Sequence, residues 1–285
     1  KKINITVKIL ENNLQIGNFI CSVINSGNYT KVSFGKESKS AGKLAANSIE
    51  KALDLTLQNK FDAMVTLPVS KSALYKAGWK YPGHTEMIAS KCGKKNPLMI
   101  LCTDKVRVGL ATIHIPLKEV HRNLKKVNII NIAKKFSESL KYDFGLNFPM
   151  IAVLGLNPHS GESGDIGKEE ITTIIPAIEL LNKNNINAQG PFPADGFFGH
   201  ELYKNYDGIL AMYHDQGLIP LKLLAKGKGV NFTAGLPIVR TSPDHGTAFE
   251  IAGRNIADHN SILNAIKLAM KIVNNRKIFN KSNLK

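Results

Sequence analysis

The sequence predicts an α/β protein, in which short buried strands alternate with helices. Three apolar runs, at residues 106–113, 150–156 and 209–212, each stop at a polar turn, as a buried strand does when it enters a loop. A fourth run at 61–67 leads through a polar turn into a helical stretch at 72–77, which is one half of a βαβ unit. With 285 residues, the chain suits one large domain or two ordinary ones.

The first third of the chain predicts strands followed by helices. Residues 3–32 alternate weakly between apolar and polar positions, which indicates short strands. Apolar side chains recur at helical spacing over residues 43–57, so an amphipathic helix is predicted there. Another helix is predicted from His84 to about Lys91, and Thr85 can cap its first turn.

The rest of the chain continues the alternation. Residues 97–103 and 106–113 predict neighbouring strands joined as a hairpin, and a polar helix is predicted at 117–140. Further helices are predicted at 169–182, after a glycine-rich loop, and at 261–274. No GxGxxG motif follows a strand, so a standard Rossmann dinucleotide site is not predicted.

Composition and charge limit the classes of partner. The net charge is +16, but the lysines are spread along the chain without interleaved aromatic residues, which favours a solvated surface over nucleic-acid binding. No apolar run approaches the roughly 20 residues that span a bilayer. The three cysteines form no CxxC pair, which favours a reducing cytoplasm. We therefore expect neither a nucleic acid nor a membrane as partner.

One histidine follows each of the three apolar runs: His114, His159 and His214. If the runs lie in one sheet, three imidazoles could converge on a divalent cation, and three protein ligands with an open position are typical of a catalytic metal. Each histidine alone could equally be an ordinary loop residue held by a backbone carbonyl. Nothing local in the sequence decides between these alternatives.

Other polar residues stand at turns near these runs. Asp215 follows His214 directly, and a rigid, proline-containing turn at 190–195 presents Asp195. Lys222, Asn231 and Arg240 are suited to holding phosphate and carboxylate oxygens. Such residues are common on protein surfaces, so each alone is a weak indication.

Together these motifs resemble the 4-hydroxythreonine-4-phosphate dehydrogenase family of pyridoxal phosphate biosynthesis. The matching pieces occur in family order from about Gly35 to the C-terminus. They are GHTE at 83–86, ATIHIPL at 111–117, GLNPH at 155–159 with Gly161-Glu162, PAD at 193–195, AMYHDQG at 211–217 and DHGTA at 244–248.

The resemblance implies an isocitrate/isopropylmalate dehydrogenase-like fold, with two discontinuous α/β domains and a cleft between them. Residues 1–105 with 230–285 would form the nucleotide-side domain, and residues 106–229 the metal- and dimer-side domain. The active unit would be a homodimer whose active site is shared between the subunits.

The resemblance also implies roles for individual residues. The metal ligands would be His114, His159 and the partner subunit's His214, and the carboxylates near the metal would be Asp195 and Asp215. The substrate contacts would be His84, Thr85, Lys222, Asn231 and Arg240. The adenosine-binding loop would be Asp244, His245, Gly246, Thr247 and Ala248, which uses no GxGxxG.

The implied activity is the oxidation and decarboxylation of 4-phosphohydroxy-L-threonine to 3-amino-2-oxopropyl phosphate. The hydride acceptor would be NAD, with NADP as the alternative, and the metal Zn, Co or Mg, of which imidazole ligands suit Zn and Co best. Asp215, Asp195 and Lys222 are all candidates for the general base. Two alternatives are a sister dehydrogenase acting on a four-carbon sugar acid 4-phosphate and a non-catalytic basic binding protein.

The sequence departs from the family pattern at its beginning. It opens Lys1-Lys2-Ile3 without methionine and lacks the family's Gly/Pro-rich first turn. We therefore expect either that the true start is missing or that this is a divergent member. A smaller departure is Ser70, where some members carry histidine.

Overall fold

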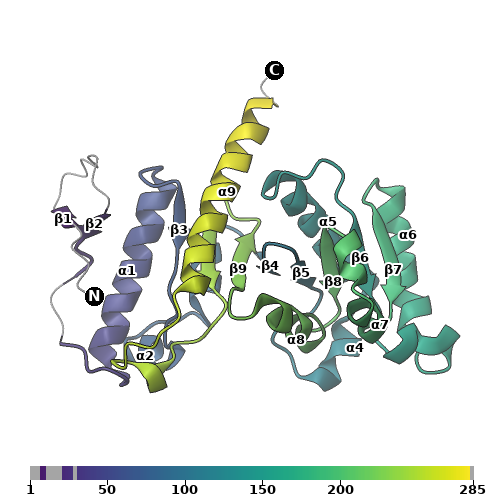
Figure 1. Ribbon diagram of the computed structural model, residues 1–285, viewed down its shortest axis with the longest axis horizontal. Coiled ribbons are helices and arrows are strands. Elements are labelled where there is room, and N and C mark those ends of the chain that lie inside the picture. The colour runs from purple at the N-terminus through teal and green to yellow at the C-terminus, as the bar shows by residue number, and fades with distance from the viewer. Residues whose placement is uncertain (1–6, 11–20, 28–30, 283–285) are drawn as a thin grey trace.

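The computed structural model describes residues 7–10, 21–27 and 31–282. Two short strands, β1 (Val7–Leu10) and β2 (Cys21–Ile24), pair in parallel at the N-terminal edge of the molecule (Figure 1). They agree with the short strands predicted for residues 3–32; residues 3–6, 11–20 and 28–30 of that segment lie outside the described residues.

The centre of the molecule is an eight-stranded mixed sheet with the order β3-β10-β9-β4-β5-β8-β6-β7 (Figure 1). β5, β8, β6 and β7 run parallel to one another, whereas β10, β9, β4 and β5 pair antiparallel. The strands are β3 (Ala63–Val65), β4 (Leu98–Cys102), β5 (Arg107–Leu110), β6 (Ile151–Leu154), β7 (Ala188–Phe192), β8 (Gly208–Ala211), β9 (Val230–Ala234) and β10 (Val239–Pro243). The predicted hairpin is confirmed, because β4 and β5 pair with Ile100 opposite Gly109.

Helices cover both faces of the sheet. The longer helices are α1 (Lys39–Leu57), α5 (Lys126–Tyr142), α8 (His214–Ala225) and α9 (Asn260–Ser282). The shorter ones are α2 (Lys71–Lys76), α3 (His84–Lys91), α4 (Val120–Asn123), α6 (Ile175–Lys183) and α7 (Ala194–Gly199). Single turns are η1 (Leu117–Glu119), η2 (Pro158–Gly164), η3 (Glu170–Ile174), η4 (Leu202–Asn205) and η5 (Phe249–Ile251).

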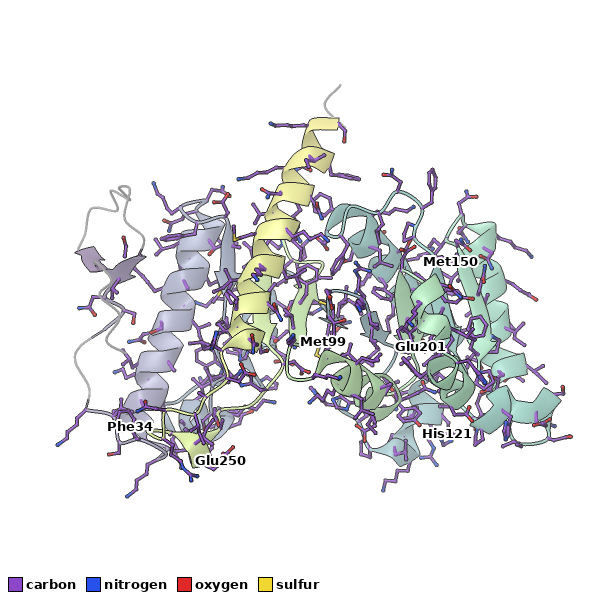
Figure 2. The ribbon with its side chains drawn as sticks, in the orientation of Figure 1. Phe34, Met99, His121, Met150, Glu201 and Glu250 are labelled. Carbon is purple, nitrogen blue, oxygen red and sulfur yellow. The ribbon has the colours of Figure 1, made fainter. Side chains whose placement is uncertain are left out.

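The core lies in two layers because strand side chains alternate between the faces of the sheet. On β8, Leu210 packs into the cluster formed with α5, α6 and α9, whereas Ile209 packs into the cluster formed with α7 and α8. Burial on both faces explains why β8 carries no polar side chain. Figure 2 shows the side chains filling the space between the sheet and the helices, with Met99 near the centre.

The single helix predicted for residues 117–140 is wrong. The structure has the short turns η1 and α4, then a break at Leu124, and α5 begins at Lys126. Leu124 takes φ −82° and ψ 77°, which is not helical, and its side chain is buried in the large core cluster. Tertiary packing of this side chain therefore overrides the local helical preference.

The sheet order separates the strands into two groups. β3, β10, β9 and β4 come from residues 1–105 and 230–285, and β5, β8, β6 and β7 come from residues 106–229. The hydrogen-bonded ladder runs without interruption from one group to the other through β4 and β5. The division into two domains stays a prediction.

Among the described residues, no helix combines the length and the apolar character needed to cross a bilayer.

Candidate active site

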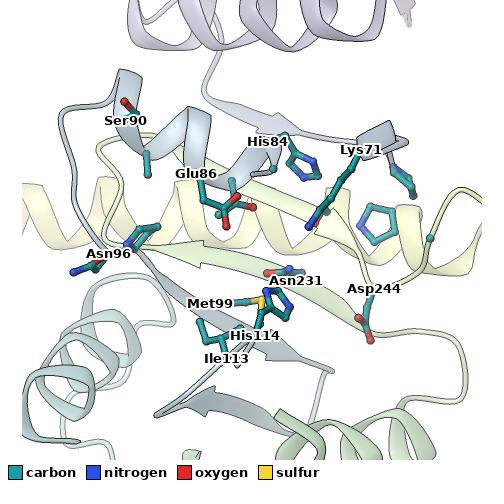
Figure 3. A pocket seen from close by; sticks show the side chains of 18 of the residues that line it. Lys71, His84, Glu86, Ser90, Asn96, Met99, Ile113, His114, Asn231 and Asp244 are labelled. Carbon is teal, nitrogen blue, oxygen red and sulfur yellow. The ribbon is translucent and has the colours of Figure 1, made fainter. Parts of the chain in front are cut away.

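A cavity of about 980 Å³ is lined mainly by residues of the ranges 1–105 and 230–285, and Ile113, His114 and Lys222 from the range 106–229 complete it (Figure 3). Figure 3 shows Lys71, His84 and Glu86 on one side of this cavity and His114, Asn231 and Asp244 on the other. The residues predicted from the sequence that line it are His84, Thr85, His114, Lys222, Asn231, Asp244, His245 and Gly246. The fold thus brings together residues that are up to 162 positions apart in the chain (residue 84 to residue 246).

Arg240 on β10 is almost fully buried, with 1% of its surface exposed, beside this cavity. Its guanidinium donates to the hydroxyls of Thr66 (2.7 Å), Thr233 (2.9 Å) and Thr85 (3.3 Å), and to Nε2 of His84. Burial lowers the pKa of Arg240 to about 10. No carboxylate of the described chain forms an ion pair with it, so its charge favours an anion in the cavity.

The capping role considered for Thr85 is wrong. Gly83 is the N-cap of α3, and no side chain caps this helix. The Thr85 hydroxyl instead accepts a hydrogen bond from Arg240, which comes from a strand 155 positions further along the chain. This long-range contact with Arg240 takes the place of the predicted cap on the N-terminus of α3.

His84 is held in its neutral form. Burial lowers its pKa to about 3, and the charges of Arg240 and Lys71 lower it further. A neutral ring that accepts at Nε2 carries its proton on Nδ1, so His84 can still donate one hydrogen bond. No role was predicted for Lys71, which begins α2 and lines the cavity.

The rings of His114 and His214 are neighbours, with 5.7 Å between their centroids and an angle of 44° between their planes. His114 follows β5, and His214 begins α8 directly after the neighbouring parallel strand β8. Burial and then the charges of His214 and Lys71 lower the pKa of His114, which favours a neutral imidazole. Nδ1 of His214 lies 2.7 Å from Oδ1 of Asp215. This contact orients the His214 ring and leaves Nε2 available as a ligand.

His159 follows β6, the next parallel neighbour of β8, so the three predicted histidines follow three adjacent parallel strands. It is exposed and belongs to the turn η2. No group of three or more His, Cys, Asp or Glu side chains able to hold a metal occurs within the described part of one chain. The pair His114 and His214 fits a metal that prefers nitrogen ligands, and a third ligand has to come from elsewhere.

The three candidates for the general base have different surroundings. Lys222 lines the 980 Å³ cavity, and its Nζ lies 4.0 Å from Oδ1 of Asp244. Asp215 is exposed and contacts His214, whereas Asp195, in the first turn of α7, is exposed and does not line this cavity. Burial raises the pKa of Asp244, and the charges of Lys222, His245 and His214 oppose this shift.

The loop at residues 244–248 continues the wall of the cavity. Asp244, His245 and Gly246 line it, whereas Thr247 and Ala248 do not. Ala248 takes a positive φ of 49° and leads into η5. The loop therefore turns away from the cavity at its end.

Two positioning residues were not found from the sequence. Gln216 accepts the backbone N–H of Met212 at Oε1 (2.7 Å) and donates from Nε2 to the carbonyl of Gly155 (2.6 Å). Glu170 is 1% exposed and accepts the backbone N–H groups of Leu156 and Asn157. Gln216 lies inside a motif quoted above, but the motif does not show what its side chain contacts.

The comparison with protein families matches residues 3–269 to the family described as pyridoxal phosphate biosynthetic protein PdxA. The chain is 44% identical over 264 residues to a 4-hydroxythreonine-4-phosphate dehydrogenase of Sulfurihydrogenibium sp., covering 90% of this chain and 81% of the relative. It is 45% identical over 257 residues to the enzyme of that name from Bacteroides thetaiotaomicron, covering 90% and 71%.

Solved structures agree with these relatives. A crystal structure of 4-hydroxythreonine-4-phosphate dehydrogenase from Klebsiella pneumoniae matches with a TM-score of 0.85 and 37% identity, covering 95% of this chain and 83% of that chain. A terephthalate 1,2-cis-dihydrodiol dehydrogenase from Burkholderia xenovorans matches with a TM-score of 0.64 and 26% identity, covering 94% and 83%. The predicted α/β fold class is confirmed.

Proposed function

Because the chain belongs to the 4-hydroxythreonine-4-phosphate dehydrogenase family, we propose that it converts 4-phosphohydroxy-L-threonine to 3-amino-2-oxopropyl phosphate. It is an oxidoreductase of pyridoxal phosphate biosynthesis. The observation that best supports this substrate is the buried Arg240, which donates hydrogen bonds to His84 and Thr85 in the wall of the cavity and has no carboxylate partner in the described chain.

The anionic groups of the substrate would bind at the Arg240 side of the cavity. Arg240 supplies the charge, while His84 and Thr85 supply neutral groups beside it. Asn231 lines the cavity, and its Oδ1 is buried without a hydrogen-bond partner in the described chain. This oxygen is suited to accept a hydrogen bond from a donor on the substrate, because a buried acceptor is costly when it stays unpaired.

The metal would be held by His114, His159 and His214. The imidazole donors fit Zn²⁺ or Co²⁺ better than Mg²⁺, which prefers oxygen ligands. When bound, the ion would act as a Lewis acid toward the hydroxyl that is oxidised and the carbonyl that forms. The resemblance assigns the ligand from the partner subunit to His214, whereas the pairing of His114 with His214 in one chain favours His159 for that position.

The reaction needs a base for the hydroxyl proton and an acceptor for the hydride. We assign the base to Lys222, because it lines the cavity whereas Asp195 does not and Asp215 contacts His214. NAD, with NADP as the alternative, would bind along the loop 244–248. It would take the hydride from the carbon that bears this hydroxyl. The resulting β-keto acid loses its carboxylate as carbon dioxide.

A homodimer would complete this site. On α8, Ile219 is 58% exposed and Leu223 is 72% exposed, and both lie on the helix that begins at His214. Apolar side chains exposed together are typical of an interface. A second copy covering α8 would bring its own histidines close to His114 and His214. The enzyme would work in the cytoplasm, which agrees with the free thiols of Cys92 and Cys102.

The test is NADH formation by the purified protein after chelation and addition of one metal at a time. We expect turnover of 4-phosphohydroxy-L-threonine with Zn²⁺ or Co²⁺ and none without metal. If the protein instead prefers a four-carbon sugar acid 4-phosphate, it is a sister dehydrogenase with that substrate. A salt-dependent complex with DNA, without metal binding or turnover, would instead support a basic binding protein.

A further inference from the structure

The turn η2, which carries His159, has an unusual backbone. Five consecutive residues, 159–163, have positive φ angles of 51°, 51°, 82°, 45° and 55°, and only the third of them is glycine. Residues other than glycine avoid this left-handed region, because the Cβ atom crowds the backbone. The turn therefore needs contacts outside itself to hold its shape.

Glu170 supplies contacts at the start of this turn. Its Oε1 accepts the backbone N–H groups of Leu156 (2.7 Å) and Asn157 (2.8 Å), and its Oε2 accepts Nδ2 of Asn157 (2.9 Å). All three donors lie between the end of β6 and His159. The Glu170 side chain comes from η3, a π-helical turn that precedes Pro176, so its position is set by a different element.

This carboxylate is buried inside the loop. It is 1% exposed, and no Lys, Arg or His forms an ion pair with it in the described chain. A Cβ at Gly161 would lie 2.7 Å from Glu170 Oε2, and one at Gly155 would lie 3.2 Å from Oε1. The loop thus wraps around the carboxylate, and N–H groups alone compensate its charge.

We propose that Glu170 is a positioning residue for the metal site: its buried carboxylate fixes the left-handed turn that presents His159. The inference rests on the proposed function, in which His159 is a metal ligand. Groups that hold a ligand from outside the coordination sphere affect metal affinity because they set the direction of the ligand atom.

The test compares Glu170→Gln with Glu169→Gln in the full-length protein, stripped with a chelator and titrated with Co²⁺. Glutamine keeps the shape but places an amide beside Nδ2 of Asn157, so two donors oppose each other. Glu169 also contacts Nδ2 of Asn157 (2.9 Å) but accepts no backbone N–H from this loop, so its variant removes the same charge without releasing the turn.

We expect Glu170→Gln to weaken Co²⁺ binding about 10–100-fold and to change the visible spectrum of the bound ion. Glu169→Gln should change both little, and both variants should bind NAD as the wild type does. If Glu170→Gln does not fold, Asn157→Ala removes the contacts of Nδ2 with Glu170 and Glu169 but keeps the two backbone N–H contacts of Glu170, and it should weaken Co²⁺ binding to a smaller extent.

Equal Co²⁺ affinity and an unchanged spectrum in Glu170→Gln, or in Asn157→Ala where that replaces it, would overturn the inference. An equal loss of Co²⁺ affinity in Glu169→Gln would also overturn it, because removing the charge alone would then explain the effect. A wild-type protein that binds no Co²⁺ and does not reduce NAD would overturn the proposed function itself.

Discussion

Gln216 on α8 donates from Nε2 to the carbonyl oxygen of Gly155 at 2.6 Å, and thereby ties the segment that carries His214 to the end of β6. The same side chain accepts the N–H of Met212. The segments that precede His159 and His214 are therefore joined through one amide, although no contact between the two histidine rings is present in the described chain.

Replacing Gln216 by glutamate should separate these two segments. The variant keeps an acceptor for Met212 but places a carboxylate oxygen against the Gly155 carbonyl, which costs about 1–3 kcal/mol of unfolding free energy. We expect kcat to fall about tenfold or more with KM for NAD unchanged. Gln189→Glu is the control, because Gln189 only accepts from the exposed Tyr206 hydroxyl. Equal kcat values in the two variants would contradict the prediction.

Arg240→Lys should raise KM for the phosphorylated substrate about tenfold or more. An ammonium group cannot reproduce the fork of N–H donors that reaches Thr66, Thr85 and Thr233. The unpaired buried groups should also cost about 1–3 kcal/mol in urea unfolding. The exposed Arg254 gives the control Arg254→Lys. An unchanged KM in Arg240→Lys would remove the assignment of the anion site.

His84 should make the protein less stable as the pH falls. Its pKa is about 3 in the folded protein, below the ordinary value of 6.5, so between these values the unfolded chain binds a proton that the folded chain does not. Stability then rises with pH across this window by at most roughly 1.4 kcal/mol per pH unit. The unfolding free energies of wild type and His84→Gln, measured in urea across this pH range, should differ by an amount that changes with this slope. Parallel plots of unfolding free energy against pH would refute the prediction.

His159→Ala should leave a folded protein with less than roughly one hundredth of the wild-type kcat, because losing a ligand exceeds the effect of a residue outside the coordination sphere. The exposed His121 gives the control His121→Ala. The measurement is NADH formation with metal added back after chelation, together with the thermal unfolding midpoint. Full activity of chelated His159→Ala would show that the metal assignment is wrong.

Leu223→Glu should convert the proposed homodimer into an inactive monomer. Its side chain is 72% exposed on α8, and burying a charge in an apolar interface is strongly unfavourable. Light scattering coupled to gel filtration measures the mass. Phe148→Glu is a control on a loop, where the side chain is 92% exposed. A dimeric and active Leu223→Glu variant would place the interface elsewhere.

The sequence was most informative about the strands next to the site. Continuous apolar runs ending in His114, His159 and His214 predicted buried strands, and β5, β8 and β6 are indeed parallel neighbours. The hairpin of β4 and β5 was also predictable, because its two strands are separated by a short polar turn. These features depend on local pattern, which a sequence displays directly.

Long-range contacts were not predictable in this way. Arg240 reaches Thr66 across 174 positions, and nothing near either residue indicates the pair. Leu124 breaks a helix because its side chain enters the core, which the local spacing does not reveal. Glu170 lies in the first turn of the helix predicted at 169–182, where a charged side chain is usually exposed. It is buried instead, because backbone N–H groups from another segment surround its carboxylate.

The unbroken ladder between β4 and β5 limits how the enzyme can move. Arg240 lies on β10 and His114 follows the end of β5, and β9 and β4 join these two strands within one hydrogen-bonded sheet. The strands beneath the two sides of the cavity therefore cannot separate by a hinge motion. A change in the relative position of β10 and β5 therefore has to twist the strands that join them.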